Sequence, residues 1–427
     1  MSNKAEDGAM KSVEKRGSVP KLRFPEFWEA GEWVPKKLIE VLNPATREVA
    51  KPSSSYLALG IRSHGKGTFH KPNQAPEKNS MNRLYLVYRD DLVVNITFAW
   101  EGAIAIAGDD DHCSYVSHRF PAYTFKSLAS MPAFFRHVIT SKAFVYKLGL
   151  ISPGGAGRNR VMNKKDFLKI PVLFPSLPEQ QKIADCLASL DELITLEAQK
   201  LGTLKTHKKG LMQQLFPAEG ETLPKLRFPE FREAGEWEPK SIGQLGEVVT
   251  GSTPSTAQPE FYGGERLFVS PADISDDRFI KKTKTTLTEP GFRETRPIKA
   301  NSILFVCIGS TIGKIAQNRH ECATNQQINS VIPNSENSDG FVYYALSGIA
   351  DKIANLAGKQ AVPIVNKSLF SSIELTVPKL PEQDRIAICL SSLDELILAQ
   401  TQKLVALKTH KKGLMQQLFP SLDESPA

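Results

Sequence analysis

The sequence lacks the features of membrane, secreted and disulfide-bonded proteins. It contains no run of about eighteen apolar residues, so we expect no transmembrane helix. Residues 1–19 are polar and have no apolar core of a signal peptide, and we expect them to form a disordered tail. The 5 cysteines are scattered and no two have CxxC spacing, which is typical of reduced thiols. These absences predict a cytoplasmic protein that does not act at a membrane.

Sequence motifs of catalysis are also missing. GSTIGK at 309–314 is similar to a phosphate-binding loop, but it is one residue too short between its glycines, and Ile315 stands where magnesium binding needs Ser or Thr. Asn43-Pro44-Ala45-Thr46 is not the NPPY-like tetrapeptide of amino-methyltransferases, and we find no GxSxG and no cluster of metal ligands. We therefore predict no catalytic residue, no metal site and no cofactor bound by this chain.

Positive charge is present in moderate excess. Lys and Arg number 54 against 46 Asp and Glu, which gives a formal net charge of +8 at pH 7. Such an excess suits a polyanionic partner such as DNA, although many basic proteins bind no nucleic acid.

An internal repeat dominates the sequence. PKLRFPEFWEAGEWVP at 20–35 returns with two changes at 224–239, and LKTHKKGLMQQLFP at 204–217 returns unchanged at 407–420. LPEQQKIADCLASLDELI likewise returns as LPEQDRIAICLSSLDELI, whereas the segments between these repeats have diverged. The pattern indicates two copies of one domain. We expect the repeated parts to contact each other or two copies of one partner. The diverged parts need only keep their fold, so they can bind different targets.

The repeated segments that begin near residues 177 and 380 have the heptad spacing of coiled-coil helices. A helix of about 38 residues would be about 57 Å long. The order of the repeats favours an antiparallel pair with one domain at each end, pseudo-two-fold symmetry and neighbouring chain ends in a circular arrangement. The apolar residues of the predicted seam are Ile183, Leu187, Leu190, Ile194, Leu201, Leu204, Ile386, Leu390, Leu393, Ile397, Leu404 and Leu407.

The diverged segments have the mixed pattern of α/β domains. Strand-like runs stand at 56–61, 84–87, 92–97, 103–107, 266–270, 302–308 and 329–333, and helical patterns at 133–148 and 340–356. The predicted fold is therefore mixed α/β, with globular domains at 20–174 and 220–377, a central helix at 175–219 and a distal helix at 378–427.

Polar and basic loop residues of the two domains are candidates for DNA contact, because Asn and Gln can pair with adenine and Lys or Arg with guanine or phosphate. Each of them alone could equally be a solvated loop group. The candidates are Arg62, His64, Lys66, Thr97, Trp100, Arg158, Asn159, Arg160, Ser310, Thr311, Lys314, Asn325, Gln326 and Gln327.

The two identical helix tails offer a second kind of site. They are either solvated faces or docking surfaces for two identical subunits. The candidates for docking are Lys208, Leu211, Leu215, Phe216, Lys411, Leu414, Leu418 and Phe419.

Together these motifs resemble the specificity subunits of Type I restriction-modification systems, over about residues 20–420. The resemblance rests on the two helical repeats, on GSTIGK with NQQIN, and on the divergent domains between the repeats. It implies two target recognition domains that each read one half of a bipartite site in double-stranded DNA, with the helix pair as the ruler between them. It also implies a chain that is not itself an enzyme.

The resemblance further implies two kinds of partner subunit. Two modification subunits would bring S-adenosylmethionine and adenine-N6 methylation, and two restriction subunits would bring ATP, Mg and DNA cleavage. Three alternatives stay open. They are the specificity chain of a methylation-only or Type II-like system, a coiled-coil scaffold with two protein-binding heads, and a nucleotide-using enzyme that GSTIGK alone suggests.

Overall fold

The chain forms two compact units in the computed structural model, which describes residues 19–154, 160–358 and 363–420. The first unit consists of residues 1–196 together with 404–427, and the second consists of residues 197–403. The tail expected at 1–19 lies outside the described residues except for Val19. Both units combine helices with sheets, which confirms the predicted mixed α/β class.

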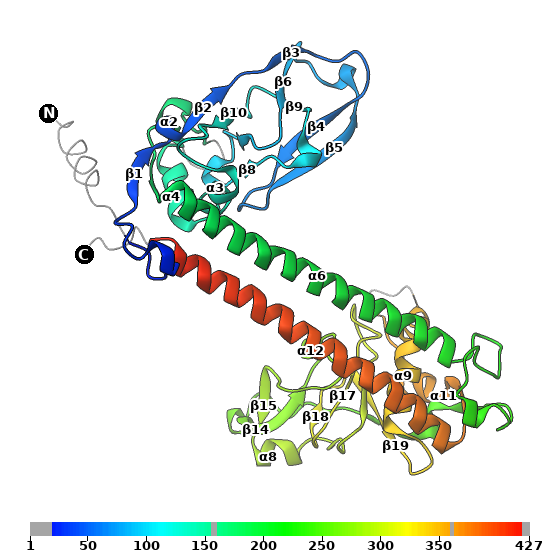
Figure 1. Ribbon diagram of the computed structural model, residues 1–427. Coiled ribbons are helices and arrows are strands. Elements are labelled where there is room, and N and C mark those ends of the chain that lie inside the picture. Colours follow the sequence, from blue (N-terminus) through cyan, green and yellow to red (C-terminus); the bar gives the residue numbers. More distant parts are fainter. Residues whose placement is uncertain (1–18, 155–159, 359–362, 421–427) are drawn as a thin grey trace. The chain divides into compact units, whose positions relative to one another are not determined.

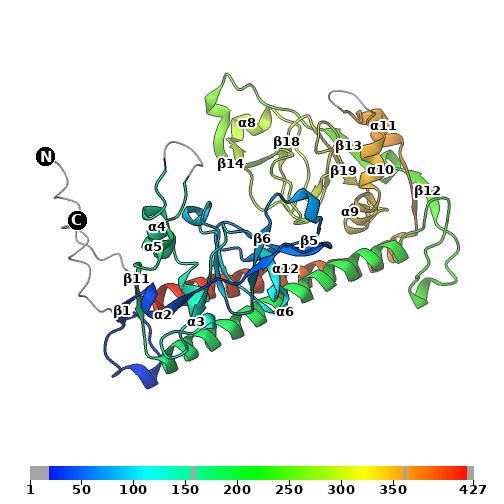
Figure 2. The ribbon, with the colours of Figure 1, turned by 90° about the horizontal axis from the view of Figure 1, so that it is seen from above.

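Two long helices each contribute to both units (Figure 1). The helix α6 (Leu177–Leu215) begins in the first unit and ends in the second, and α12 (Leu380–Leu418) does the reverse. Within each unit the two helix segments lie side by side and antiparallel, as both views show (Figures 1 and 2). In the described part of the chain, no helix is both long and apolar enough to cross a lipid bilayer.

Among its described residues, the first unit carries three antiparallel or mixed sheets, with strand orders β1-β11, β2-β10-β7-β8 and β3-β6-β9-β4-β5. Its strands are β1 (Val34–Lys37), β2 (Leu42–Ala45), β3 (Glu48–Ala50), β4 (Tyr56–Ile61), β5 (Thr68–Gln74), β6 (Arg83–Val87), β7 (Leu92–Val94), β8 (Ile104–Ile106), β9 (Ser114–Val116), β10 (Ala122–Phe125) and β11 (Pro171–Phe174). Its shorter helices are η1 (Pro25–Phe27), α2 (Leu38–Val41), η2 (Pro76–Lys78), η3 (Ala99–Glu101), η4 (Asp109–Asp111), α3 (Pro132–Val138), α4 (Lys142–Leu150) and α5 (Lys164–Phe167).

The part of the second unit that the structure describes also carries three sheets, with strand orders β12-β20, β13-β19-β16-β17 and β15-β14-β18. Its strands are β12 (Glu238–Ser241), β13 (Gly246–Thr250), β14 (Tyr262–Val269), β15 (Thr285–Leu287), β16 (Ile303–Val306), β17 (Ile315–Gln317), β18 (Ala323–Thr324), β19 (Ile328–Pro333) and β20 (Glu374–Val377). Its shorter helices are η5 (Pro229–Phe231), α7 (Ile242–Leu245), η6 (Pro259–Phe261), α8 (Glu289–Arg293), α9 (Asp339–Gly348), α10 (Ala350–Asn355) and α11 (Lys367–Ser372).

The four-stranded sheets of the two units have the same topology. In the order β2-β10-β7-β8, every strand has a counterpart at the same place in β13-β19-β16-β17. A short helix opens after a capping asparagine in each unit. The Asn163 side chain accepts from the N–H groups of Lys165 and Asp166, and Asn366 accepts from that of Leu369. The shared topology and caps support two copies of one domain.

Each core is completed by the end of a long helix. In the first unit Leu418 is 2% exposed, and the ring of Phe419 stacks on Phe134 with centroids 5.5 Å apart. In the second unit Leu215 is 1% exposed, and Phe216 stacks on Phe341 at 5.3 Å. The last turn of each helix is therefore part of a core.

Candidate nucleic-acid interface

A buried carboxylate ties the start of α6 to the first repeat. The Arg23 guanidinium donates to both Glu179 oxygens, from Nε at 2.8 Å and from Nη2 at 2.7 Å. Trp33 Nε1 donates to the same carboxylate at 3.2 Å, and Arg23 Nη1 donates to the Gly31 carbonyl at 2.6 Å. The hydrogen bond with Glu179 raises the pKa of Arg23. The charge-assisted fork fixes the first repeat on the helix.

The second unit repeats this arrangement around Glu382. Arg227 donates to it from Nε at 2.8 Å and from Nη2 at 2.7 Å, and Trp237 Nε1 donates at 3.3 Å. Arg227 Nη1 donates to the Gly235 carbonyl at 2.7 Å. No functional role was predicted for these residues from the sequence. The signal was the identity of Arg, Trp and Glu in both copies.

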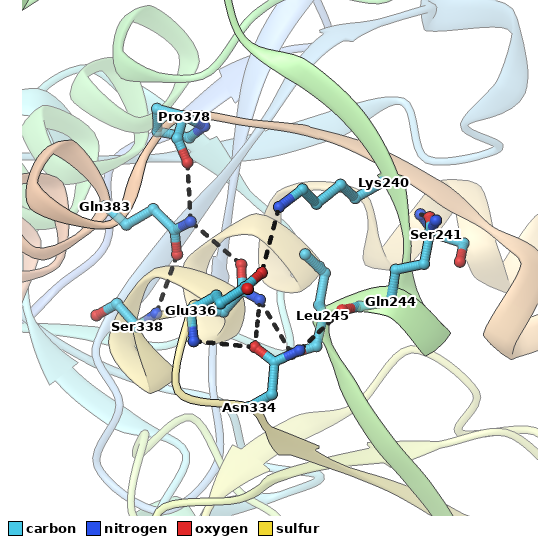
Figure 3. Close-up of polar contacts among 10 residues, drawn as sticks. Lys240, Ser241, Gln244, Leu245, Asn334, Glu336, Ser338, Pro378 and Gln383 are labelled. Atoms are coloured by element: carbon cyan, nitrogen blue, oxygen red, sulfur yellow. Dashed lines mark hydrogen bonds and ion pairs between the residues drawn. The ribbon is translucent and has the colours of Figure 1, made fainter.

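The glutamine that follows each carboxylate holds the globular part of its unit. In the second unit Gln383 accepts from the Ser338 N–H at 3.0 Å and donates to Pro378 O at 2.9 Å and Asn337 Oδ1 at 3.2 Å (Figure 3). Asn337 continues the network to Leu245 O at 3.2 Å. The domain is thereby held to the first turn of α12.

Gln180 has the matching place in the first unit. Its side chain accepts from the Met131 N–H at 3.2 Å and donates to Pro175 O at 3.1 Å. Each globular part is therefore attached to the first turn of a long helix, and this attachment fixes the orientation of its loops relative to that helix segment.

Two ion pairs lie among the apolar residues of the predicted seam. Lys208 pairs with Asp394 at 2.5 Å in the second unit, and Lys411 pairs with Asp191 at 2.5 Å in the first. All twelve residues of the predicted seam are buried or half-buried.

The predicted docking residues of the helix tails are largely used within the chain. Leu215 and Leu418 are core residues of their own units, so the prediction is wrong for these two. Phe216 and Phe419 are half-buried and stack on core rings, as described above. Leu211 and Leu414 are half-buried against the same cores, and Lys208 and Lys411 form the seam ion pairs.

Three candidates of the first unit lie on the tip of the β4–β5 hairpin, where Arg62, His64 and Lys66 are all exposed. The tip is held in place, because the His64 N–H donates to Glu101 O at 2.7 Å and the Gly65 N–H donates to Gly102 O at 3.0 Å. Arg62 itself donates to the Thr68 carbonyl and stands over the Phe69 ring. The hairpin tip is thus joined to the loop after β7.

That loop carries an indole, and two arginines from other segments reach the loop. Trp100 Nε1 donates to Thr97 O at 3.2 Å, and the Arg160 guanidinium stands 5.2 Å from the centre of the Trp100 ring. Arg119, which the sequence analysis did not single out, donates to Thr97 Oγ1 at 3.3 Å. The structure therefore brings Thr97, Trp100 and Arg160 together. Arg158 and Asn159 lie outside the described residues.

Candidates of the second unit lie on two neighbouring loops, one after β16 and one before β19. Ser310 is exposed and Thr311 half-exposed in the first loop, whose Gly309 lies beside Gln327. In the second loop Asn325 Nδ2 donates to Gln327 Oε1 at 3.0 Å. The structure therefore brings these candidates to one place.

A third loop, Gly251–Thr253, completes this surface. The Thr253 hydroxyl donates to Gln326 Oε1 at 2.7 Å. A Cβ at Gly251 would lie 2.3 Å from the carbonyl oxygens of Thr324 and Asn325, so only glycine allows the loops to approach so closely. No role in the site was predicted for this loop from the sequence.

Lys314 has a different environment from the other candidates. Its Nζ donates to Pro271 O at 3.3 Å and to Ile274 O at 3.1 Å. The ammonium is therefore engaged by backbone carbonyls of its own unit, and Lys314 is a weaker candidate for DNA contact than its neighbours.

Comparison with known families gives a match to both halves of the sequence. The model described as Type I restriction modification DNA specificity domain matches residues 31–206 and again residues 234–409. These ranges cover most of the chain and coincide with the two copies of the repeat.

Curated relatives carry related descriptions. The specificity subunit of the Type I restriction enzyme HindI from Haemophilus influenzae is 36% identical over 147 residues, or 33% of this chain and 32% of that protein. The specificity subunit of EcoR124I/EcoR124II from Escherichia coli is 28% identical over 250 residues, or 55% of this chain and 58% of that protein. The chain thus matches less than two thirds of either relative's length.

Solved structures share the fold. A crystal structure of the S subunit of a Type I restriction-modification system from M. genitalium superposes with a TM-score of 0.60 at 15% identity, covering 95% of this chain and 100% of that one. A chain from a structure concerned with assembly and conformational transition of the Type I R-M system gives a TM-score of 0.56 at 16% identity, covering 91% and 98%. These likenesses concern the fold alone.

Proposed function

Because this chain belongs to the Type I restriction modification DNA specificity family, we propose that it is the DNA-sequence-specificity subunit of a Type I restriction-modification enzyme. Each globular domain reads one half of a bipartite target in double-stranded DNA. The long helices set the distance between the two half-sites.

The observation that carries this proposal is a contrast within the repeated domain. The contacts that hold each domain on its helix are the same in both copies, as Glu179 and Glu382 illustrate. The loops at the candidate interface differ, with arginines and Trp100 in the first unit and Ser, Thr, Asn and Gln in the second. Constant attachment with variable polar loops is what two readers of different DNA sequences require.

The chain contributes recognition and other subunits contribute chemistry in this proposal. Two modification subunits would carry S-adenosylmethionine and methylate adenine at N6, and two restriction subunits would carry ATP and Mg and cleave DNA in the cytoplasm. The modification subunits would dock on the exposed sides of α6 and α12. Leu193 and Leu396 are matching residues of the SLDELI repeats and are 38% and 55% exposed, which suits two identical partners.

The proposal can be tested by methylation in a host that lacks adenine methylation. The chain would be expressed with the modification subunit of its own system, and N6-methyladenine would be mapped across the genome. We expect a split motif with two short defined halves around undefined bases. Soluble, co-purifying proteins that leave the genome unmethylated and show no salt-dependent binding to DNA would contradict the proposal.

A further inference from the structure

We infer that Arg119 and Gln327 occupy one recognition position that recurs in the two units, and that the residue at this position selects a base in its half-site. Arg119 would select guanine and Gln327 would select adenine. The inference rests on the proposed function and deepens it, because it assigns one base in each half-site to a named side chain.

The backbone establishes that the two positions are equivalent. Arg119 precedes β10 and Gln327 precedes β19, which are matching strands of the two four-stranded sheets. The Arg119 carbonyl accepts from the Ile96 N–H at 3.0 Å, and the Gln327 carbonyl accepts from the Cys307 N–H at 2.8 Å. Ile96 and Cys307 follow the matching strands β7 and β16.

The turn before each strand is built in the same way. The Ser117 hydroxyl accepts from the Arg119 N–H at 3.3 Å, and Asn325 Oδ1 accepts from the Gln327 N–H at 3.2 Å. A side chain two residues upstream therefore fixes the turn in both units. This shared turn holds the Cα–Cβ direction of residue 119 or 327 in a defined geometry.

Both side chains also reach the loop that follows the neighbouring strand. Arg119 Nη1 donates to Thr97 Oγ1 at 3.3 Å, and Gln327 Nε2 donates to Ile308 O at 3.5 Å. Thr97 and Ile308 each lie one residue beyond Ile96 and Cys307. The same position thus borders the candidate loops of its own unit, the Trp100 loop in one case and the Ser310 loop in the other.

The chemistry of the two side chains suits different bases. Arg119 is exposed and has no carboxylate partner among the residues that the structure describes, so its remaining donors can form the fork that pairs with O6 and N7 of guanine. Beyond its hydrogen bonds with Ile308 and Asn325, Gln327 keeps one amide N–H and one lone pair of its side-chain oxygen, which match N7 and N6 of adenine. Sequence alone gave no reason to single out Arg119, because NQQIN has no visible counterpart around it.

The test uses the full chain with its modification subunit and maps methylated sites for wild type, Arg119→Ala, Arg119→Lys and Gln327→Ala. Arg89→Ala is the matched control, since Arg89 is exposed and already paired with Asp90 and Asp109. Arg119→Ala should relax one guanine position of one half-site, with discrimination falling roughly 5- to 150-fold, and leave the other half-site unchanged. Gln327→Ala should relax one adenine position in the other half-site.

The lysine variant separates base contact from charge. Arg119→Lys keeps the charge, so the salt dependence of DNA binding should persist while guanine discrimination falls. An Arg119→Ala protein that melts like wild type and methylates the same bases would overturn the inference, as would a uniform loss of affinity with a shallower salt slope. If the wild-type chain itself yields no bipartite motif, the proposed function fails first and the inference fails with it.

Discussion

Glu179 and Glu382 each accept hydrogen bonds from two side chains of the repeated segments. Each is nearly buried, at 1% and 4% side-chain exposure, and each accepts from an arginine and a tryptophan. A buried charge of this kind is stable only with its partners, because removal of one partner leaves the other uncompensated. The identity of these residues in the two repeats therefore corresponds to the identity of the contacts that they form.

We expect Glu179→Gln to destabilise the first unit by about 3 kcal/mol, because the buried Arg23 would lose its counter-ion. Urea denaturation measures the loss, and hydrogen exchange should localise it to the start of α6. Glu26→Gln is the matched control, since Glu26 forms an exposed pair with Lys182 and should change stability little. Equal effects of the two variants would contradict a special role for Glu179.

The buried imidazole of His137 makes the stability of the first unit depend on pH. Burial, followed by the charge of Lys411, lowers its pKa from 6.5 to about 4, while Asp191 raises it and Arg136 lowers it slightly. Between these two values the unfolded chain binds a proton that the folded chain does not, so stability falls as the pH falls. We expect a loss of about 3 kcal/mol between pH 6.5 and pH 4.

His137→Phe should flatten this pH dependence while keeping an aromatic ring in the core. The measurement is urea denaturation at several pH values for both proteins. If the variant loses as much stability as wild type, other groups carry the effect and the assignment to His137 is wrong.

At the scale of elements, the helix pair depends on the apolar seam and on the polar pairs that interrupt it. In the second unit Gln400 Nε2 donates to Glu197 Oε2 at 2.6 Å and to Glu197 O at 2.9 Å, and Lys403 contacts the same carboxylate. Hydrogen bonds from Gln400 and then Lys403 lower the pKa of Glu197. A polar pair of this kind favours one register over others, as polar residues do at coiled-coil seams.

Replacing Leu190 and Leu393 with Asp should break the helix pair, because both side chains are half-buried in the seam. We expect a loss of about 2 kcal/mol or more for each substitution and weaker assembly with partner subunits. Thermal unfolding and co-purification measure the two effects. Leu196→Asp and Val405→Asp are the controls, since these side chains are 55% and 59% exposed and lie outside the Leu193 and Leu396 pair proposed for docking, and stability should hold in them.

The elements that the sequence predicted best are those with a long, regular pattern. The helices expected at 175–219 and 378–427 are observed at Leu177–Leu215 and Leu380–Leu418. The strand expected at 56–61 is β4. The helix expected at 133–148 is instead two helices, because Ser141 caps α4 by accepting from the Phe144 N–H at 3.2 Å.

The candidate site was harder to predict, because its geometry depends on contacts distant in sequence. The apolar tails at Leu215 and Leu418 gave no sign that they enter a core, since a docking surface would have the same composition. Arg119 was missed for a related reason. Its place in the candidate site follows from hydrogen bonds with Ile96 and Thr97, and no local sequence pattern predicts these contacts.

At the scale of the whole molecule, each recognition domain should be exchangeable by itself. Replacing residues 36–174 with the matching domain of another family member should change one half of the DNA site and leave the other half unchanged. The reason is that the exchanged segment excludes both repeated helices and the anchors Arg23 and Glu179. Methylation mapping of the chimaera is the measurement, and a change in both halves would contradict independent recognition.

The two junctions between repeat and helix have the same contacts. The Leu22 N–H donates to Gln417 O at 3.0 Å in the first unit, and the Leu226 N–H donates to Gln214 O at 2.9 Å in the second. Gln214 and Leu226 are joined by the short segment that follows α6, whereas Leu22 and Gln417 are far apart in sequence. Their equal contacts confirm the predicted circular arrangement of the repeats.

The first unit therefore closes last during synthesis. All of the second unit, residues 197–403, has been translated before the ribosome adds Leu418 and Phe419, which complete the core around Trp33 and Phe134. The core of the first domain therefore stays incomplete while some two hundred further residues are translated, at about 5–20 residues per second. A premature stop just before the codon of Leu418 would thus damage a domain encoded far upstream of it, the one that contains Trp33 and Phe134.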